Sequence, residues 1–237
     1  MSAKTKLLLL FGIPAIIPVL GLILYYFLGT HAIPSLAIFI LIELFITLPI
    51  FFWMMCQFEH QSFSFSSIKK IIGPQNCVSG LHFTLICIGT LIWAMSIFML
   101  SNGLSLSLQN NLFSWLPEWA NLGDYLLNKA NYSTLSLKTS WILLAVASLL
   151  FPIAEELYFR GYVLPKTNHL GKWSPVVHTL FFALYHLWSI WLFPIRFIAT
   201  LPLYYFVWKH KNIYLGIVVH CILNIVGDVI FSYGEIF

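Results

Sequence analysis

Residues 139–164 read TSWILLAVASLLFPIAEELYFRGYVL, and this stretch decides the fold class. It is apolar and long enough to cross a bilayer, which takes about 20 residues of α-helix. Three charged residues, Glu155, Glu156 and Arg160, nevertheless lie near its end. A charge at bilayer depth costs roughly 2.5–3.5 kcal/mol on insertion scales, so such residues usually face a wet cavity and mark function. We therefore expect chemistry at this point of the membrane.

The whole chain has the composition of a membrane protein. Hydrophobic residues make up 60% of its 237 residues, charged residues only 8%, and the mean hydropathy is +0.89. Globular proteins carry about 25% charged residues. We predict an all-α fold, a polytopic transmembrane helical bundle with seven or eight spans, in which residues 1–237 form a single integral membrane domain.

The distribution of charges and cysteines argues against two other classes of protein. The formal net charge is +4, but the 12 Lys and Arg residues form no run or stripe that could track phosphates, so we expect no nucleic-acid partner. The four cysteines show no C-x-x-C pair or other zinc-ligand spacing. We interpret them as core residues and expect no metal or redox role for them.

Hydropathy places membrane spans near residues 6–28, 34–56, 80–101, 139–164, 175–193, 196–208 and 213–234. The sixth is short, bounded by Pro194 and interrupted by Pro202, so we expect a broken or re-entrant helix there. Residues 102–138 mix aromatic residues with amides, which is typical of the membrane interface and compatible with a surface helix.

The positions of the cations predict the topology. The apolar run after Lys6 has no small-residue cleavage site, so we expect a retained first span and a cytoplasmic N-terminus. Seven spans then place nine cations inside and three outside, as the positive-inside rule requires, the outer three being Lys129, Lys138 and Arg196. An eighth span within 102–138 would disturb that balance. We expect a multi-pass protein of a bacterial cytoplasmic membrane.

Polar residues recur in the later apolar segments, His186 in the fifth span and His220 with Asn224 in the last. At a rise of about 1.5 Å per residue, Glu155, His186 and His220 should lie roughly 10–17 Å from the same membrane face. Three helices are thus predicted to direct polar groups into one layer.

Helical geometry gives the two adjacent carboxylates different tasks. Neighbouring residues diverge by about 100° around a helix, whereas residues four apart share a face. Glu156 can therefore pair with Arg160 in a supporting role, which leaves Glu155 as a free carboxylate and candidate general base. Pro152, one turn earlier, removes a backbone hydrogen bond and favours a kink that admits water.

The two histidines also come with partners at helical spacing. Phe182 and His186 share one face of their helix, as do His220 and Asn224. An imidazole can transfer protons and an amide can donate to an oxyanion. The set could activate water without a serine or cysteine nucleophile.

These motifs resemble those of the CPBP intramembrane proteases, which include the type II CAAX prenyl endopeptidases and the bacterial Abi proteins. The family signature is E-E-x-x-x-R, then F-x-x-x-H, then H-x-x-x-N or D. Here it reads EELYFR from Glu155, FALYH from Phe182 and HCILN from His220. All signature positions match in order over about residues 150–228.

The resemblance implies a glutamate protease that needs no metal, with its catalytic core within residues 139–234. Glu155 would activate the hydrolytic water with help from His186, and His220 and Asn224 would stabilise the oxyanion. Glu156, Arg160 and Phe182 would support them. The substrate would be a membrane-associated polypeptide, lipidated or not.

Three alternatives stay open. Glu155, His186 and His220 are possible zinc ligands of an open metalloprotease site, although the chain has no H-E-x-x-H helix. Intramembrane carboxylates and histidines also relay protons in transporters, although the expected inverted repeats are not visible. The chain could also be a non-catalytic regulatory member of the same family.

Four further polar residues lie in apolar segments. Glu43 and Asp228 are candidates for lining a polar cavity, Asp228 by supporting Asn224 from the next turn. His82 and His178 are lone histidines in apolar segments, and we interpret them as packing residues.

Overall fold

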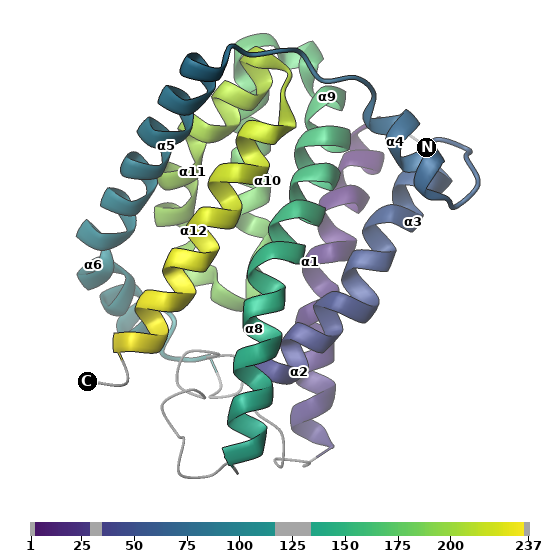
Figure 1. Cartoon of the computed structure of the whole chain (residues 1–237). Helices are drawn as coiled ribbons and strands as arrows, with labels where there is room; N and C mark the ends of the chain where they lie inside the picture. The colour runs from purple at the N-terminus through teal and green to yellow at the C-terminus, as the bar shows by residue number, and fades with distance from the viewer. Residues whose placement is uncertain (1–2, 29–34, 117–133, 235–237) are drawn as a thin grey trace.

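The computed structural model describes residues 3–28, 35–116 and 134–234. Within these ranges every regular element is a helix and no strand occurs, which confirms the all-α prediction. The long segments run alternately up and down the bundle in Figure 1. They are α1 (Ala3–Phe27), α2 (Ser35–Ile42) continued by η1 (Glu43–Thr47) and α3 (Leu48–Phe58), α5 (Gly80–Leu100), α8 (Thr134–Glu155) continued by η5 (Glu156–Val163), α10 (Ser174–Tyr185), α11 (Phe193–His210) and α12 (Ile213–Gly234).

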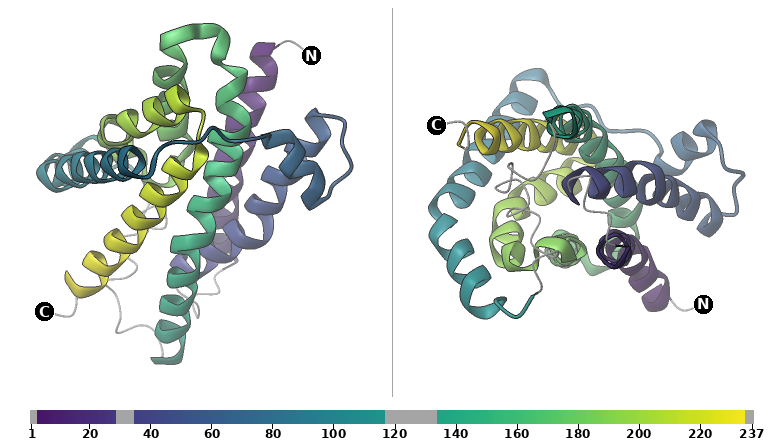
Figure 2. Two further views of the ribbon diagram at one scale, coloured as in Figure 1. Left: turned by 45° about the horizontal axis from the view of Figure 1, so that its top comes forward. Right: turned by 90° about the horizontal axis from the view of Figure 1, so that it is seen from below.

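Short elements connect these segments. They are α4 (Phe65–Ile72), α6 (Asn102–Ser107), η2 (Leu108–Leu112), α9 (Leu164–Lys166), η6 (Asn168–Trp173) and η7 (Leu187–Leu192). The predicted interfacial segment 102–138 begins with α6 and η2, and its residues 117–133 lie outside the described part of the chain. Seen from below, α5 packs beside α11 and α12 at one edge, while α1 and α3 occupy the opposite edge (Figure 2).

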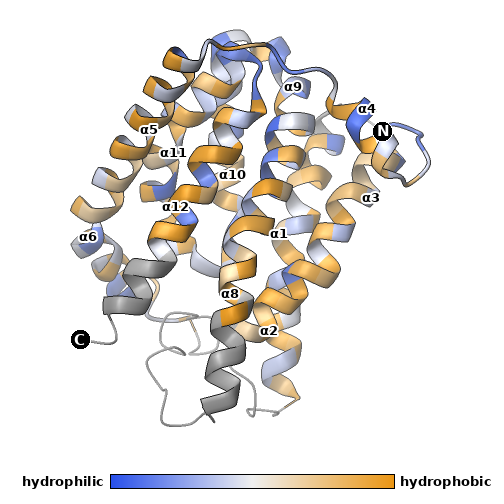
Figure 3. Ribbon diagram, viewed as in Figure 1, coloured by the Kyte–Doolittle hydropathy of each residue, from blue (hydrophilic) through white to orange (hydrophobic). Residues whose placement is uncertain are grey.

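The surface of the bundle is suited to lipid, and the chain is an integral membrane protein. Hydrophobic residues dominate the helices along their length, and hydrophilic residues gather at the end that carries α4 and α9 (Figure 3). Among the described residues, four segments are long and apolar enough to span a membrane by themselves, namely Thr5–Phe27, Ala37–Phe58, Gly80–Leu100 and Leu187–His210. Ile213–Gly227 is a shorter apolar helix. The total of seven or eight spans stays a prediction.

Two helix boundaries differ from those expected. The segment predicted at 175–193 is interrupted, because α10 ends at Tyr185 and the backbone of Ser189 is not helical (φ −144°, ψ 51°). The next segment, predicted to be short and broken at Pro202, is instead the continuous helix α11. A proline in a helix leaves the carbonyl four residues earlier without its usual donor. The indole Nε1 of Trp93 on α5 donates to that carbonyl, Ile198 O, at 3.0 Å, so the neighbouring helix satisfies it.

An aromatic core holds α1, α3, η5 and α10 together near the site. The ring of Phe51 stacks on Tyr158 at 4.4 Å between centroids, and Phe159 contacts Phe182 edge to face at 5.2 Å. The Tyr158 hydroxyl donates to the carbonyl oxygen of Leu10 at 2.9 Å. These contacts fix η5, which carries Glu156 and Arg160, against α1 and α3.

Candidate active site

The four residues predicted to be catalytic line one cavity. Its volume is about 500 Å³, and its walls come from α2 and η1, α5, α8, α10, α11 and α12. Glu155, His186, His220 and Asn224 all contribute to the lining. The structure therefore brings together side chains that lie up to 69 positions apart in the sequence, from 155 to 224.

Glu155 is the last residue of α8, where the helix passes into the wider π-helix η5. Its side chain is buried, and its Oε2 atom lies 3.8 Å from Nε2 of His220. π-Helical segments within α-helices are rare and are frequent at functional sites. Glu155 lies at such a junction and lines the cavity.

Glu156 is fully buried and has two partners. Its Oε1 atom lies 3.2 Å from Nη1 of Arg160, the ion pair that the i, i+4 spacing predicts. The same oxygen lies 3.0 Å from Nδ1 of His220. A carboxylate only accepts, so Nδ1 carries the proton and donates to Glu156. The two adjacent glutamates thus contact opposite nitrogens of one imidazole, a link that sequence reasoning missed because His220 belongs to a distant helix.

Gly216 makes this approach possible, although the sequence analysis did not identify it. A Cβ atom at position 216 would overlap the carboxylate of Glu156. Gly216 lies one turn before His220 on α12, so both residues face η5. The one available signal was the i, i+4 spacing of this glycine from the signature histidine.

Arg160 is held between two aromatic rings. Its Cζ atom lies 3.9 Å from the ring centroid of Phe182 and 3.6 Å from that of Tyr204. Such cation–π contacts are strongest where the cation is desolvated, and the Arg160 side chain is fully buried. Phe182 therefore positions the cation that pairs with Glu156.

His186 follows the last residue of α10 and has a non-helical backbone (φ −81°, ψ 58°). Its Nδ1 atom lies 2.9 Å from the carbonyl oxygen of Phe182. A carbonyl can only accept, so Nδ1 carries the proton. In the neutral ring Nε2 is then free to accept a proton in the cavity.

Two further charged residues line the cavity. Glu43 lies in the π-helix η1 and is 2% exposed, and its place in the cavity wall is the one proposed from the sequence. Arg196 was expected only among the outer cations, and it was not predicted to belong to the site. It lies in the first turn of α11 and its Nη2 donates to Ser189 Oγ at 2.9 Å. The signal missed was an arginine in a long apolar segment.

The remaining polar candidates lie elsewhere. His178 is fully buried and its Nε2 lies 2.8 Å from the carbonyl oxygen of Phe159, in agreement with a packing role. His82 is exposed beside His210, with ring centroids 5.1 Å apart, so it does not pack in the core as predicted. The side chain of Asp228 lies outside the described part of the chain, so its predicted role remains a prediction.

The described residues contain no group of three or more His, Cys, Asp or Glu side chains arranged to hold a metal ion. The predicted absence of a cofactor remains a prediction that a metal assay must test.

Comparison with known proteins agrees with the signature. Residues 137–226 match the family model of the type II CAAX prenyl endopeptidases described as Rce1-like. This range contains all three motifs, so the match supports the resemblance found in the sequence. No curated protein and no solved structure matches the chain at the significance that we required.

Proposed function

We propose that this protein is an intramembrane endopeptidase that hydrolyses a peptide bond of a membrane-associated polypeptide with water activated by Glu155. The single observation that carries the proposal is the shared cavity of Glu155, His186, His220 and Asn224. The family match supports a peptidase of the CAAX type. We therefore propose a substrate held at the membrane, with a lipidated polypeptide as the first candidate.

In the proposed reaction, the Glu155 carboxylate takes a proton from water, and the water oxygen forms a bond to the scissile carbonyl carbon. The free Nε2 of His186 accepts a hydrogen bond from that water and helps to hold it. His220, protonated on both ring nitrogens at this step so that Nε2 can donate, and Asn224 stabilise the oxyanion that develops on the carbonyl oxygen. The C–N bond then breaks, and the proton held by Glu155 passes to the leaving amine.

The arrangement around His220 supports this division of roles. Glu156 engages Nδ1 and fixes the ring, so that Nε2 is the atom that faces Glu155 and the cavity. Arg160 holds Glu156 in place. Orientation of a reacting imidazole by a buried carboxylate is a recurrent device of hydrolases.

The test compares membranes of cells that lack the native gene and carry the wild-type protein, Glu155→Gln or His186→Ala. We expect one polypeptide to change length with the wild type alone, because loss of a general base lowers the rate by roughly 10²–10⁴. Glu59→Gln is the matched control, since that carboxylate lies outside the cavity. Full cleavage by either cavity variant at normal expression would disprove the mechanism.

We also propose that hydrolysis needs no metal. Cleavage by the purified protein should survive chelation, with less than stoichiometric zinc. Loss of activity on chelation and recovery with zinc would favour the metalloprotease alternative. Proton-dependent uptake into vesicles without any hydrolysis would favour the transporter, and a phenotype unaffected by Glu155→Gln would favour a non-catalytic family member.

A further inference from the structure

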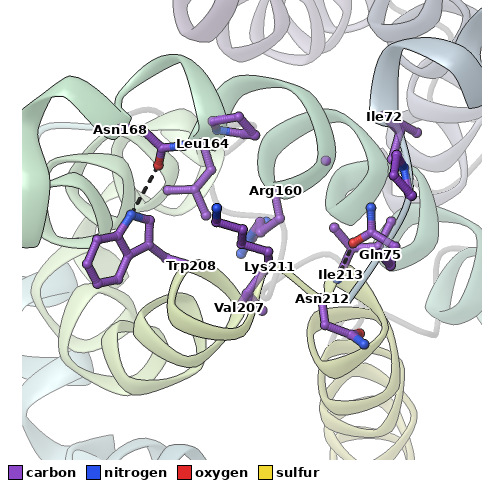
Figure 4. Close-up of a pocket in the computed structure, with 13 residues that line it drawn as sticks. Ile72, Gln75, Arg160, Leu164, Asn168, Val207, Trp208, Lys211, Asn212 and Ile213 are labelled. Atoms are coloured by element: carbon purple, nitrogen blue, oxygen red, sulfur yellow. Dashed lines mark hydrogen bonds between the residues drawn. The ribbon is translucent and has the colours of Figure 1, made fainter. Parts of the chain in front are cut away.

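A second pocket, of about 210 Å³, lies at the end of the bundle that carries α9, where α11 turns into α12 (Figure 4). Its lining includes Arg160 and Lys211 together with the amide side chains of Gln75, Asn168 and Asn212. None of its lining residues is acidic. Charge alone therefore favours a negative occupant.

Arg160 is the buried cation of this lining, and Figure 4 shows it among the other lining residues. The rings of Phe182 and Tyr204 cover the guanidinium, and Glu156 lies beside Nη1. None of the three guanidinium nitrogens has an aligned hydrogen bond to a described residue. Donors left unpaired in this way are costly, and an unsatisfied buried group calls for a partner.

The start of α12 adds a second attraction for an anion. The backbone N–H of Ile213 donates to Oε1 of Gln75 and that of Tyr214 donates to Oδ1 of Asn212, both at 2.9 Å. Both N–H groups are thus already paired, and what this 22-residue helix adds to the pocket wall at Ile213 is the positive end of its dipole. Lys211, which precedes the helix, is exposed and has a left-handed backbone with φ 50°.

The planar fork of an arginine matches two oxygens of a carboxylate or a phosphate. We propose that this pocket binds a small oxyanion, a phosphate or carboxylate group, through Arg160 and Lys211, and that the bound anion competes with Glu156 for Arg160. When Arg160 binds the anion, its ion pair with Glu156 is weakened. Glu156 then orients His220 less firmly, so the anion lowers peptidase activity. This second effect rests on the proposed function, whereas the binding itself does not.

The binding test uses the purified full-length protein in detergent and inorganic phosphate as the probe, at constant ionic strength. Trp208 lines the pocket, so occupancy is read as the change in tryptophan fluorescence that disappears in Trp208→Phe, with the melting temperature as a second readout. Lys211→Asn removes the charge but keeps a residue that tolerates the left-handed backbone. Lys209→Gln is the charge-matched control, because Lys209 is exposed nearby but does not line the pocket.

We expect saturable binding by the wild type and by Lys209→Gln, and about tenfold weaker binding by Lys211→Asn, the effect of one charge-assisted hydrogen bond. Binding that does not saturate, or that is equal in all three proteins, would overturn the site. The same titration in phosphatidylcholine nanodiscs with and without phosphatidic acid identifies the source of the anion. Loss of the phosphate response in the phosphatidic acid discs indicates a lipid headgroup, and an unchanged response indicates a soluble anion.

Coupling to the active site is measured by cleavage of the substrate found by membrane proteomics. Phosphate should slow cleavage by the wild type and have a much smaller effect on Lys211→Asn. Equal slowing in both proteins would disprove the coupling while the binding result stands. A protein that binds phosphate but cleaves nothing would contradict the proposed function and leave the site in place.

Discussion

Two carboxylates of this protein, Glu156 and Glu59, each contact two cationic or potentially cationic side chains, but in opposite surroundings. Glu156 is fully buried between Arg160 and His220 inside the bundle. Glu59 follows α3 at the end of the bundle, has a side chain that is 34% exposed, and lies 2.6 Å from Lys166 and 3.5 Å from Lys6. The two carboxylates have similar partners but should differ in their contribution to stability, because the free-energy cost of losing a charged partner is much larger for a buried pair than for an exposed one.

The largest effect is expected from Glu156→Gln. Removing one member of a buried pair leaves its partner charged and unpaired, at a cost of about 3–5 kcal/mol in stability. The substitution also removes the charged acceptor of His220 Nδ1, so we expect at least about a hundredfold lower kcat, by analogy with carboxylates that orient catalytic histidines. Thermal melting in detergent measures the first effect and cleavage kinetics the second. A melting temperature equal to that of the wild type would contradict the claim that the buried ion pair of Glu156 contributes more to stability than the exposed pairs of Glu59.

Gly216→Ala should give a smaller effect at the same place. The new methyl group would displace the Glu156 carboxylate, and overpacking of this kind costs about 1–3 kcal/mol. We expect a lower melting temperature and a lower kcat with little change in KM, because the substituted residue does not line the cavity. Gly89→Ala is the control, since a Cβ there meets nothing within 4 Å. Equal melting temperatures and equal kcat values for the two variants would mean that α12 can shift to accommodate the methyl group without loss of stability.

The smallest effect is expected from Glu59→Gln, below about 1 kcal/mol and weaker at high salt, as is usual for an exposed ion pair. Burial by itself would raise the pKa of Glu59, but hydrogen bonds from Lys166 and Tyr162 and the charge of both lysines outweigh it, so the pKa lies below its ordinary value. A lowered pKa in the folded state means that the stabilisation is present above the unfolded-state pKa of about 4.3 and is lost as pH falls through the folded-state pKa.

Melting temperatures of the wild type and of Glu59→Gln should therefore differ at neutral pH and converge in acid. A difference that persists at low pH, or one as large as that of Glu156→Gln, would remove the contrast between the two carboxylates.

Local spacing predicted those contacts that lie within one helix. The four-residue interval between Glu156 and Arg160 predicted their ion pair, and the motif order located the residues that line the cavity. The place of Arg196 in the cavity wall was not predicted, because the boundary between α10 and α11 was expected at a different residue. That boundary depends on the non-helical backbone of Ser189, which a hydropathy profile cannot detect.

The sequence by itself determined that this is a helical membrane protein whose motifs resemble those of the CAAX proteases, because apolar length and the spacing of a few charged residues are properties of the chain alone. Only the tertiary structure decided that Glu155 and Glu156 lie on either side of His220, that Gly216 leaves room for them, and that Trp93 satisfies the carbonyl freed by Pro202. Each of these contacts joins different helices, and the relative rotation and depth of packed helices are set by how their side chains fit together.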